Sequence, residues 1–311
     1  MRDMIIQVNQ LTRKFGERTT VKGISFALEK GSCTALLGPN GAGKTTTLRM
    51  LAGLLSPSGG TIRRSGHQSK GRFSNNFSQI GYLPQHPSFY KWMSGLEFVV
   101  YTARLSGMSK LEARSEAEAV LDRVGLKSAA RRRISDYSGG MKQRLGLAQA
   151  LVHHPDLLLL DEPVSALDPV GRREVMELLQ ELKGETTILI STHVLHDAEE
   201  VCDRVMMMRE GEIVENGELS DLLDKYSLPV LNLQLEYHSS QHAADWLKSL
   251  RERSFVLEYE QQGSAASITV SDIREARAVI LSEAAERHIP LQRFEAGSSS
   301  LEKMFMKVVQ S

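Results

Sequence analysis

The hydrophobic positions of the chain change their spacing several times, and these changes predict a mixed α/β fold. At 4–8 and 24–28, apolar residues either alternate with polar ones or follow one another, and a polar turn lies between the two stretches. This pattern predicts antiparallel strands. Short apolar runs at 32–37, 156–160 and 186–191 are typical of strands buried in a parallel sheet. An apolar stripe at helical spacing follows each run, as expected where helices cover a sheet.

A helical pattern interrupts this alternation in the middle of the N-terminal part. From Ser94 to about Ile134, apolar residues recur at helical spacing in two stripes, separated by Gly107 and ended near Gly125. We therefore expect an inserted helical subdomain at about 90–135. Before it, a turn cluster up to Gly60 and a polar, aperiodic stretch at 63–78 predict a loop.

The periodicities restart beyond about Tyr226, which predicts a second, smaller α+β domain. Its order of elements is that of a split-βαβ, ferredoxin-like unit: strands near 231–237, 255–259, 267–270 and 289–294, with helices at 241–252 and 273–284. A capping box of Ser299 and Glu302 predicts a last helix with an apolar stripe. We expect domains at 1–220 and 228–311.

A glycine-rich stretch stands between the apolar run at 32–37 and a helical stripe. Glycines let backbone N–H groups turn inward around phosphates, and the helix N-terminus adds its positive dipole end. Lys44 is then placed to reach the β- and γ-phosphates of a nucleotide, and Thr45 to ligate Mg²⁺. The alternative is a chance glycine-rich turn. The predicted nucleotide-binding residues are Gly38, Pro39, Asn40, Gly41, Ala42, Gly43, Lys44, Thr45 and Thr46.

Acidic residues end the buried run at 156–160. Asp161 is a candidate ligand of Mg²⁺ or its waters, and Glu162 is a candidate base that polarises an attacking water. The alternative is a turn with surface acids. The run at 186–191 delivers His193 to the same sheet edge, where a γ-phosphate contact is needed, although an isolated histidine is more often structural.

Other candidates stand at predicted strand and helix ends. Gln85 follows a short strand stopped by Pro84, or else is a turn glutamine facing water. Ser138 and two glycines precede a helical stripe, which predicts a second anion site at a helix N-terminus. Phe15 lies near the first turn and either stacks on a purine base or faces the core as an ordinary strand residue.

Composition narrows the class of protein. The 311 residues hold 38 Lys and Arg against 38 Asp and Glu, so no global field attracts nucleic acid or an acidic membrane. Cys33 and Cys202 stand alone, which fits a reducing cytoplasm rather than a disulfide framework or zinc site. No signal-peptide core and no apolar run of about eighteen residues is evident, so we expect no membrane-spanning segment.

Across residues 1 to about 220, the chain resembles the ATP-binding subunit of an ABC transporter. The motifs match in order: the phosphate loop Gly38–Thr45, the Gln85 loop, the signature loop Tyr137–Arg144, Walker B at Leu157–Glu162, the D-loop Ser165–Asp168 and the switch histidine Ser191–His193. The resemblance implies a P-loop NTPase (RecA-like) core with an antiparallel β subdomain. Met141 replaces the usual Gln and Val164 a frequent Thr, but neither change removes a catalytic group.

The resemblance also implies roles for the candidate residues. Phe15 would stack on adenine. Glu162, His193, Lys44 and Gln85 would be catalytic, while Thr45, Gln85 and Asp161 would hold Mg²⁺. In a head-to-tail dimer, one subunit would present Ser138, Gly139, Gly140 and Asp168 to the ATP held by the other.

The partners implied are an integral membrane permease and a second ATP-binding subunit, with no nucleic acid. The dimer would close on ATP at the cytoplasmic face of the cell membrane and drive transport, with export as the expected direction. A soluble ATPase of the same fold in translation or DNA repair is the alternative. It is disfavoured because one cassette is present without a long coiled-coil insertion. A P-loop kinase offers no role for Ser138 to Gly140.

Overall fold

The computed structural model describes residues 3–64, 79–165, 167–226, 229–236 and 240–298. The chain divides into two compact units, Met1–Leu219 and Ser220–Ser311. Each has a hydrophobic core of its own, built from buried residues of that unit alone. Of the loop predicted at 63–78, residues 65–78 lie outside the described residues, as does the predicted last helix from Ser299 onward; Arg63 and Arg64 belong to strand β4 (Gly59–Arg64) rather than to a loop.

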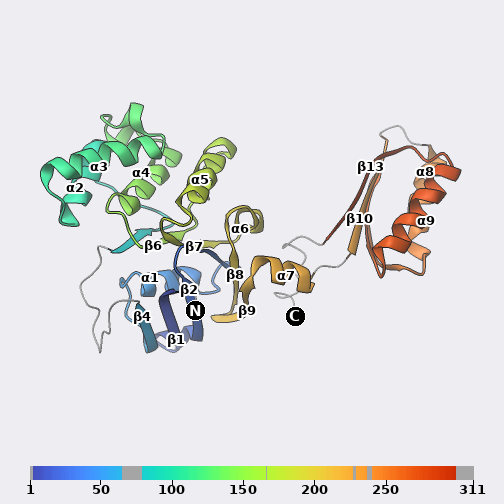
Figure 1. Ribbon diagram of the computed structural model, residues 1–311, viewed down its shortest axis with the longest axis horizontal. Coiled ribbons are helices and arrows are strands. Elements are labelled where there is room, and N and C mark those ends of the chain that lie inside the picture. Colours follow the sequence, from blue (N-terminus) through green and yellow to red (C-terminus); the bar gives the residue numbers. More distant parts are fainter. Residues whose placement is uncertain (1–2, 65–78, 166, 227–228, 237–239, 299–311) are drawn as a thin grey trace. The chain divides into compact units, whose positions relative to one another are not determined.

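A six-stranded sheet forms the centre of the N-terminal unit, in the order β5-β6-β7-β3-β8-β9. Figure 1 labels β6, β7, β8 and β9 of this sheet. Its strands are β3 (Cys33–Leu37), β5 (Ile80–Leu83), β6 (Leu157–Asp161), β7 (Thr187–Thr192), β8 (Arg204–Arg209) and β9 (Glu212–Glu218). All neighbours pair in parallel except β9, which forms an antiparallel hairpin with β8. Strands β3, β6 and β7 are buried along their whole length, as their short, mainly apolar runs predict.

A second, antiparallel sheet has the order β2-β1-β4, with β1 (Met4–Phe15), β2 (Arg18–Glu29) and β4 (Gly59–Arg64). Helix α1 (Lys44–Leu51) packs against β2 of this sheet and against β6 and β7 of the other. Leu48, Met50 and Leu51 of α1 are fully buried in the shared core. The helix that follows the glycine-rich stretch is therefore held between two sheets.

The inserted helical part contains α2 (Gly95–Leu105), α3 (Lys110–Arg123), η2 (Lys127–Ala129) and η3 (Ile134–Asp136), and α4 (Gly139–Leu151) packs on α2 and α3. Capping boxes begin the first two helices: Ser94 with Glu97, and Ser109 with Glu112. The remaining helices of this unit are α5 (Pro169–Leu182) and α6 (Leu195–Val201), which contact each other. The fold class predicted from the sequence, an α/β core with these additions, is confirmed.

The C-terminal unit is a four-stranded antiparallel sheet in the order β11-β12-β10-β13. Its elements follow the predicted β-α-β-β-α-β order: β10 (Pro229–Leu235), α8 (Gln241–Ser249) with η4 (Leu250–Glu252), β11 (Val256–Gln262), β12 (Ala265–Val270), α9 (Ile273–Glu286) and β13 (Leu291–Ser298). The first and third strands are central and the second and fourth are at the edges, which is the arrangement of a ferredoxin-like sheet. Trp246 is buried in its core.

Some local predictions are wrong. Gly59 and Gly60 belong to β4 rather than to a turn, because β1 approaches so closely that a Cβ on Gly60 would lie 2.2 Å from the carbonyl oxygen of Gln10. Leu257 is 59% exposed, because the pairing of β11 with β12 shifts register at this point. Helix α7 (Leu219–Tyr226) was not predicted from the sequence; it is only eight residues long.

Candidate active site

The glycine-rich stretch connects β3 to α1 and closes tightly around its own backbone. Gly41 and Gly43 have φ values of 84° and 109°, a left-handed region that favours glycine. A Cβ on Gly38 would lie 2.3 Å from the carbonyl oxygen of Met208 in β8, so only glycine fits there. Pro39, Asn40 and Gly41 are exposed on the outside of this loop.

Lys44 is buried at the first position of α1, and its hydrogen-bond partners among the described residues are backbone oxygens. Its Nζ donates to the carbonyl oxygens of Gly38 at 2.6 Å and Pro39 at 3.2 Å. Burial lowers the pKa of Lys44, while the nearby charges of Glu162 and Asp161 raise it in part. The loop thus contains a desolvated cation that an anion would stabilise.

The carboxylate of Asp161 lies beside Thr45 at the carboxyl end of β6. Thr45 and Ser191 both donate hydroxyl hydrogen bonds to Asp161 Oδ1, at 3.2 Å and 2.5 Å. Asp161 is 1% exposed, and its Oδ2 has no hydrogen-bond partner in the part of the chain that the structure describes. A buried carboxylate oxygen without a partner beside a threonine hydroxyl fits a hard divalent cation. Within the described part of the chain, no cluster of three His, Cys, Asp or Glu side chains suits a metal, so other ligands would come from bound phosphate and water.

Glu162 and His193 come together across the ends of β6 and β7. His193 Nδ1 lies 2.8 Å from Glu162 Oε1. Glu162 is buried, whereas the His193 side chain is 51% exposed. Glu162 has a φ of 52°, uncommon for a non-glycine residue, and its N–H donates to the Ser191 carbonyl. The strained turn points the carboxylate toward the strand that carries the histidine.

Ser138 and Asp168 are the N-caps of α4 and α5. The Ser138 hydroxyl accepts from the Met141 N–H at 3.2 Å, and Asp168 Oδ1 accepts from the Gly171 N–H at 2.9 Å. Both caps are exposed, as is Gly139, and Gly140 is half-buried. Among the described residues, no hydrogen bond connects Ser138, Gly139 or Gly140 to the phosphate loop.

Gln85 and Phe15 lie apart from this cluster of contacts. Gln85 is exposed in a bend two residues beyond β5, and no hydrogen bond of the described residues joins it to Thr45 or Asp161. Phe15 ends β1 with 47% of its surface exposed. The Arg13 guanidinium lies 4.5 Å from the centre of the Phe15 ring, so one ring face is occupied by a cation.

Two residues that contact the site residues are not predicted from the sequence. Ser191 was read as a strand residue, because a single serine in an apolar run carries no sign of which carboxylate it will meet; it contacts Asp161. Arg13 was read as part of a polar turn, although its spacing of two from Phe15 places both side chains on one face of a strand.

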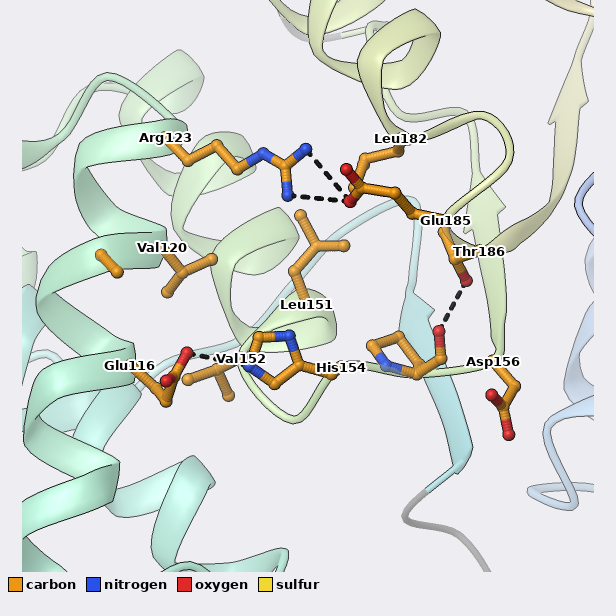
Figure 2. A pocket seen from close by; sticks show the side chains of 12 residues that line it. Glu116, Val120, Arg123, Leu151, Val152, His154, Asp156, Leu182, Glu185 and Thr186 are labelled. Atoms are coloured by element: carbon orange, nitrogen blue, oxygen red, sulfur yellow. Dashed lines mark hydrogen bonds and ion pairs between the residues drawn. The ribbon is translucent and has the colours of Figure 1, made fainter.

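A separate cavity of about 250 Å³ lies at the opposite, amino ends of β6 and β7, lined in part by Asp156 and Thr186 (Figure 2). Two side-chain contacts join α3 to the segments that lead into β6 and β7: Arg123 pairs with Glu185 at 3.4 Å, and the Glu116 carboxylate lies 2.8 Å from His154 Nε2. These contacts fasten the helical part at a distance from the phosphate loop.

The sheet order, the loop between β3 and α1, and the acids at the end of β6 define a P-loop nucleoside triphosphatase. The family described as "ABC transporter" matches residues 21–165, and that described as "ATP-binding protein DrrA1-3-like, C-terminal domain" matches residues 217–309.

Similar proteins agree with both matches. The chain is 45% identical over 307 residues to the "Uncharacterized ABC transporter ATP-binding protein YxlF" of Bacillus subtilis, covering 99% of this chain and 100% of that protein. It is 34% identical to the daunorubicin/doxorubicin resistance ATP-binding protein DrrA of Streptomyces peucetius, covering 97% and 91%. The dimeric, post-hydrolysis ATP-binding cassette MJ0796 bound to ADP and Pi superposes with a TM-score of 0.63 at 25% identity, covering 69% of this chain and 99% of that one.

The chain belongs to the family of ABC transporter ATP-binding proteins. It is therefore a nucleotide-binding ATPase subunit, and the resemblance drawn from its motifs is confirmed. A soluble ATPase of translation or DNA repair is not favoured.

Proposed function

We propose that this subunit hydrolyses ATP at the edge formed by β3, β6 and β7 and thereby drives export through a separate membrane permease. The observation that carries the proposal is the convergence of Lys44, Asp161, Glu162 and His193 at that edge. Similarity to DrrA, a drug resistance protein, supports export rather than import.

The residues suggest a division of labour. Lys44 binds the β- and γ-phosphates, and Glu162 accepts a hydrogen bond from the attacking water and orients it. His193, held by Glu162, reaches the γ-phosphoryl group. Thr45 and Asp161 would hold Mg²⁺, which supplies positive charge to the phosphates. Gln85 would join this set when nucleotide draws its loop inward, and Phe15 would stack on adenine with the ring face that Arg13 leaves open.

A second ATP-binding subunit would complete the site. Ser138, Gly139 and Gly140 form a helix N-terminus whose N–H groups suit an anion, yet no hydrogen bond of the described residues ties them to the phosphate loop of their own chain. We propose that they and Asp168 face the γ-phosphate held by a partner subunit. The dimeric state of the similar cassette MJ0796 supports this arrangement.

An aromatic cluster on the helical part is the proposed docking surface for the permease. Tyr90 lies with ring centres 6.2 Å from those of both Trp92 and Tyr101. These three side chains are 52%, 72% and 42% exposed. Exposed, contiguous aromatics mark protein contacts, and tyrosine and tryptophan often dominate their energetics. The cluster follows Gln85 closely in sequence, so nucleotide and permease could be sensed by one segment.

The described residues include no helix long and apolar enough to cross a membrane. We propose that the subunit acts at the cytoplasmic face of the cell membrane through its permease, with no role for nucleic acid, since the net charge is +0.

The docking surface is tested by co-expressing the chain with the membrane protein encoded beside it and purifying the pair in detergent. We expect Trp92→Ala with Tyr101→Ala to weaken the complex by about tenfold or more, because aromatic anchors account for much of interface binding energy. Leu54→Ala, at a 63% exposed leucine outside the cluster, is the matched control and should leave co-purification unchanged. If the aromatic variant and the Leu54→Ala control co-purify with the membrane protein equally well, the aromatic cluster is not the docking surface. Fractionation of the wild type with ribosomes or DNA alone would instead end the transporter proposal.

We also propose that residues 1–220 form an independent ATP-binding domain and residues 228–311 an accessory domain for regulation or dimer formation. The two units have separate cores, so a chain ending at Ser220 should fold and bind ATP with an affinity within about threefold of the full chain. Circular dichroism and calorimetric titration check this result. Aggregation of the truncated chain, or loss of its ATP binding, would show that the domains fold as one.

A further inference from the structure

The helices that follow β6 and β7 are joined by a partly buried ion pair whose members are not among the ATP-binding or catalytic residues proposed above. Arg172, in the first turn of α5, donates from Nε to Asp197 Oδ1 at 2.8 Å, and its Nη2 donates to the same oxygen. Asp197, in the first turn of α6, is 3% exposed, and the Arg172 side chain is 35% exposed. A buried carboxylate with an arginine partner fixes the geometry of the groups that carry it.

The pair closes a path between two loops of the proposed site. Asp168 caps α5 and its carbonyl accepts from the Arg172 N–H, so Arg172 is fixed to the loop containing Asp168. Asp197 lies four residues beyond His193. Among the described residues, the half-exposed imidazole of His193 makes a polar contact with Glu162 alone, so its position depends on the backbone between β7 and α6.

Helix α6 needs such an anchor. It has only seven residues, and its N-cap, Val194, has no side chain that can accept a hydrogen bond. Helices this short are not stable alone in water. The contacts that link α6 to α5 through side-chain donors are Arg172 to Asp197 at its beginning and Gln180 to the Glu200 carbonyl near its end, within the described residues.

We infer that Arg172 and Asp197 are positioning residues for ATP hydrolysis, which hold α6 against α5 so that His193 stays against Glu162. The inference rests on the proposed role of His193. The pair acts through the position of His193 and not through contact with nucleotide. Breaking the pair should therefore slow turnover without weakening ATP binding.

The test separates positioning from stability with a double variant of the full-length chain. Arg172→Met alone leaves a buried charge unpaired and should lower the Tm. Adding Asp197→Asn removes that charge and should restore the Tm to within about 2 °C of the wild type. We expect kcat of the double variant to remain about tenfold or more below the wild type, with the KM for ATP within about twofold. A purely structural pair would recover kcat together with the Tm.

Two further variants make every outcome decisive. Arg172→Lys keeps the charge and should fold with an intermediate kcat, so the inference is still tested if the double variant aggregates. Arg173→Met with Glu177→Gln removes an exposed pair from the same helix, 2.9 Å apart, and should leave kcat unchanged. Wild-type kcat in the double variant would overturn the inference; if the double variant aggregates, wild-type kcat in Arg172→Lys would overturn it. Wild-type kcat in His193→Ala, assayed alongside, would instead overturn the proposed role of His193.

Discussion

The variant Glu162→Gln is expected to bind MgATP with nearly normal affinity and to hydrolyse it about a hundredfold or more slowly. An amide keeps the size of the side chain and can still contact His193, but it cannot act as a base toward water. Loss of a positioned base commonly costs 10²- to 10⁴-fold in rate. Glu162 is the candidate because it is buried one residue beyond Asp161 and its carboxylate is held by His193 at 2.8 Å.

Steady-state turnover and the Kd for MgATP of the purified full-length chain give the measurement. Glu181→Gln is the matched control, since Glu181 is an exposed residue of α5 and its change should affect neither quantity. Turnover within about twofold of the wild type in Glu162→Gln would remove Glu162 from the base role. Equal losses of binding and turnover would indicate a ground-state contact with nucleotide instead.

Long, uninterrupted patterns predicted the core of this fold. The strands β3, β6 and β7 are buried on both faces, so each gives a short run dominated by apolar or β-branched residues. The sequence order of the C-terminal unit, with its clear alternations, likewise predicted the ferredoxin-like sheet that forms. Where a strand is buried on both faces, or buried on alternate residues, its position could be predicted from this one sequence.

Irregular pairing hid the rest. Strands β1 and β2 each span twelve residues, but several register shifts between them break the period of two, and only 4–8 and 24–28 could be recognised. Gly59 and Gly60 resembled a turn because the close approach of β1 cannot be read from sequence. The hydrophobic pattern of a strand reflects the burial of its own residues, whereas register shifts and close backbone approaches depend on a neighbouring strand that is distant in sequence.

The same limit applies to the site. Topology brings Asp161, Glu162 and His193 to one edge because parallel strands share their carboxyl ends. Which oxygen faces which donor is a matter of side-chain contacts, so the Ser191 hydrogen bond to Asp161 could not be foreseen. The Arg172–Asp197 pair was equally hidden, since twenty-five positions separate its members.

Lys44→Met is expected to abolish most of the stabilisation that ATP gives the protein while leaving the nucleotide-free protein at least as stable. Burial lowers the pKa of Lys44, with Glu162 and Asp161 acting in the opposite direction, so the net environment of the Lys44 side chain disfavours the charged form. Because this pKa lies below the value in the unfolded chain, the cost of the charge is fully present at pH values below the folded pKa and is relieved above it. Methionine keeps an unbranched apolar stem and removes that cost.

The substitution should lower the stability of the nucleotide-bound state, because the buried ammonium group of Lys44 contacts phosphate when ATP is bound. A lost hydrogen bond to a charged group weakens binding by about 1.5–3 kcal/mol, or roughly 10- to 150-fold. At an ATP concentration of about 100 Kd, the wild type gains about 2.7 kcal/mol and its Tm should rise by about 5–10 °C. With binding weakened about a hundredfold, Lys44→Met at the same concentration gains about 0.4 kcal/mol, a rise of about 1 °C. Thermal scans of the variant with and without MgATP measure both effects. A rise in Tm on adding MgATP equal to that of the wild type would remove Lys44 from phosphate binding. A Tm below that of the wild type without nucleotide would show that attraction to Asp161 and Glu162 outweighs desolvation.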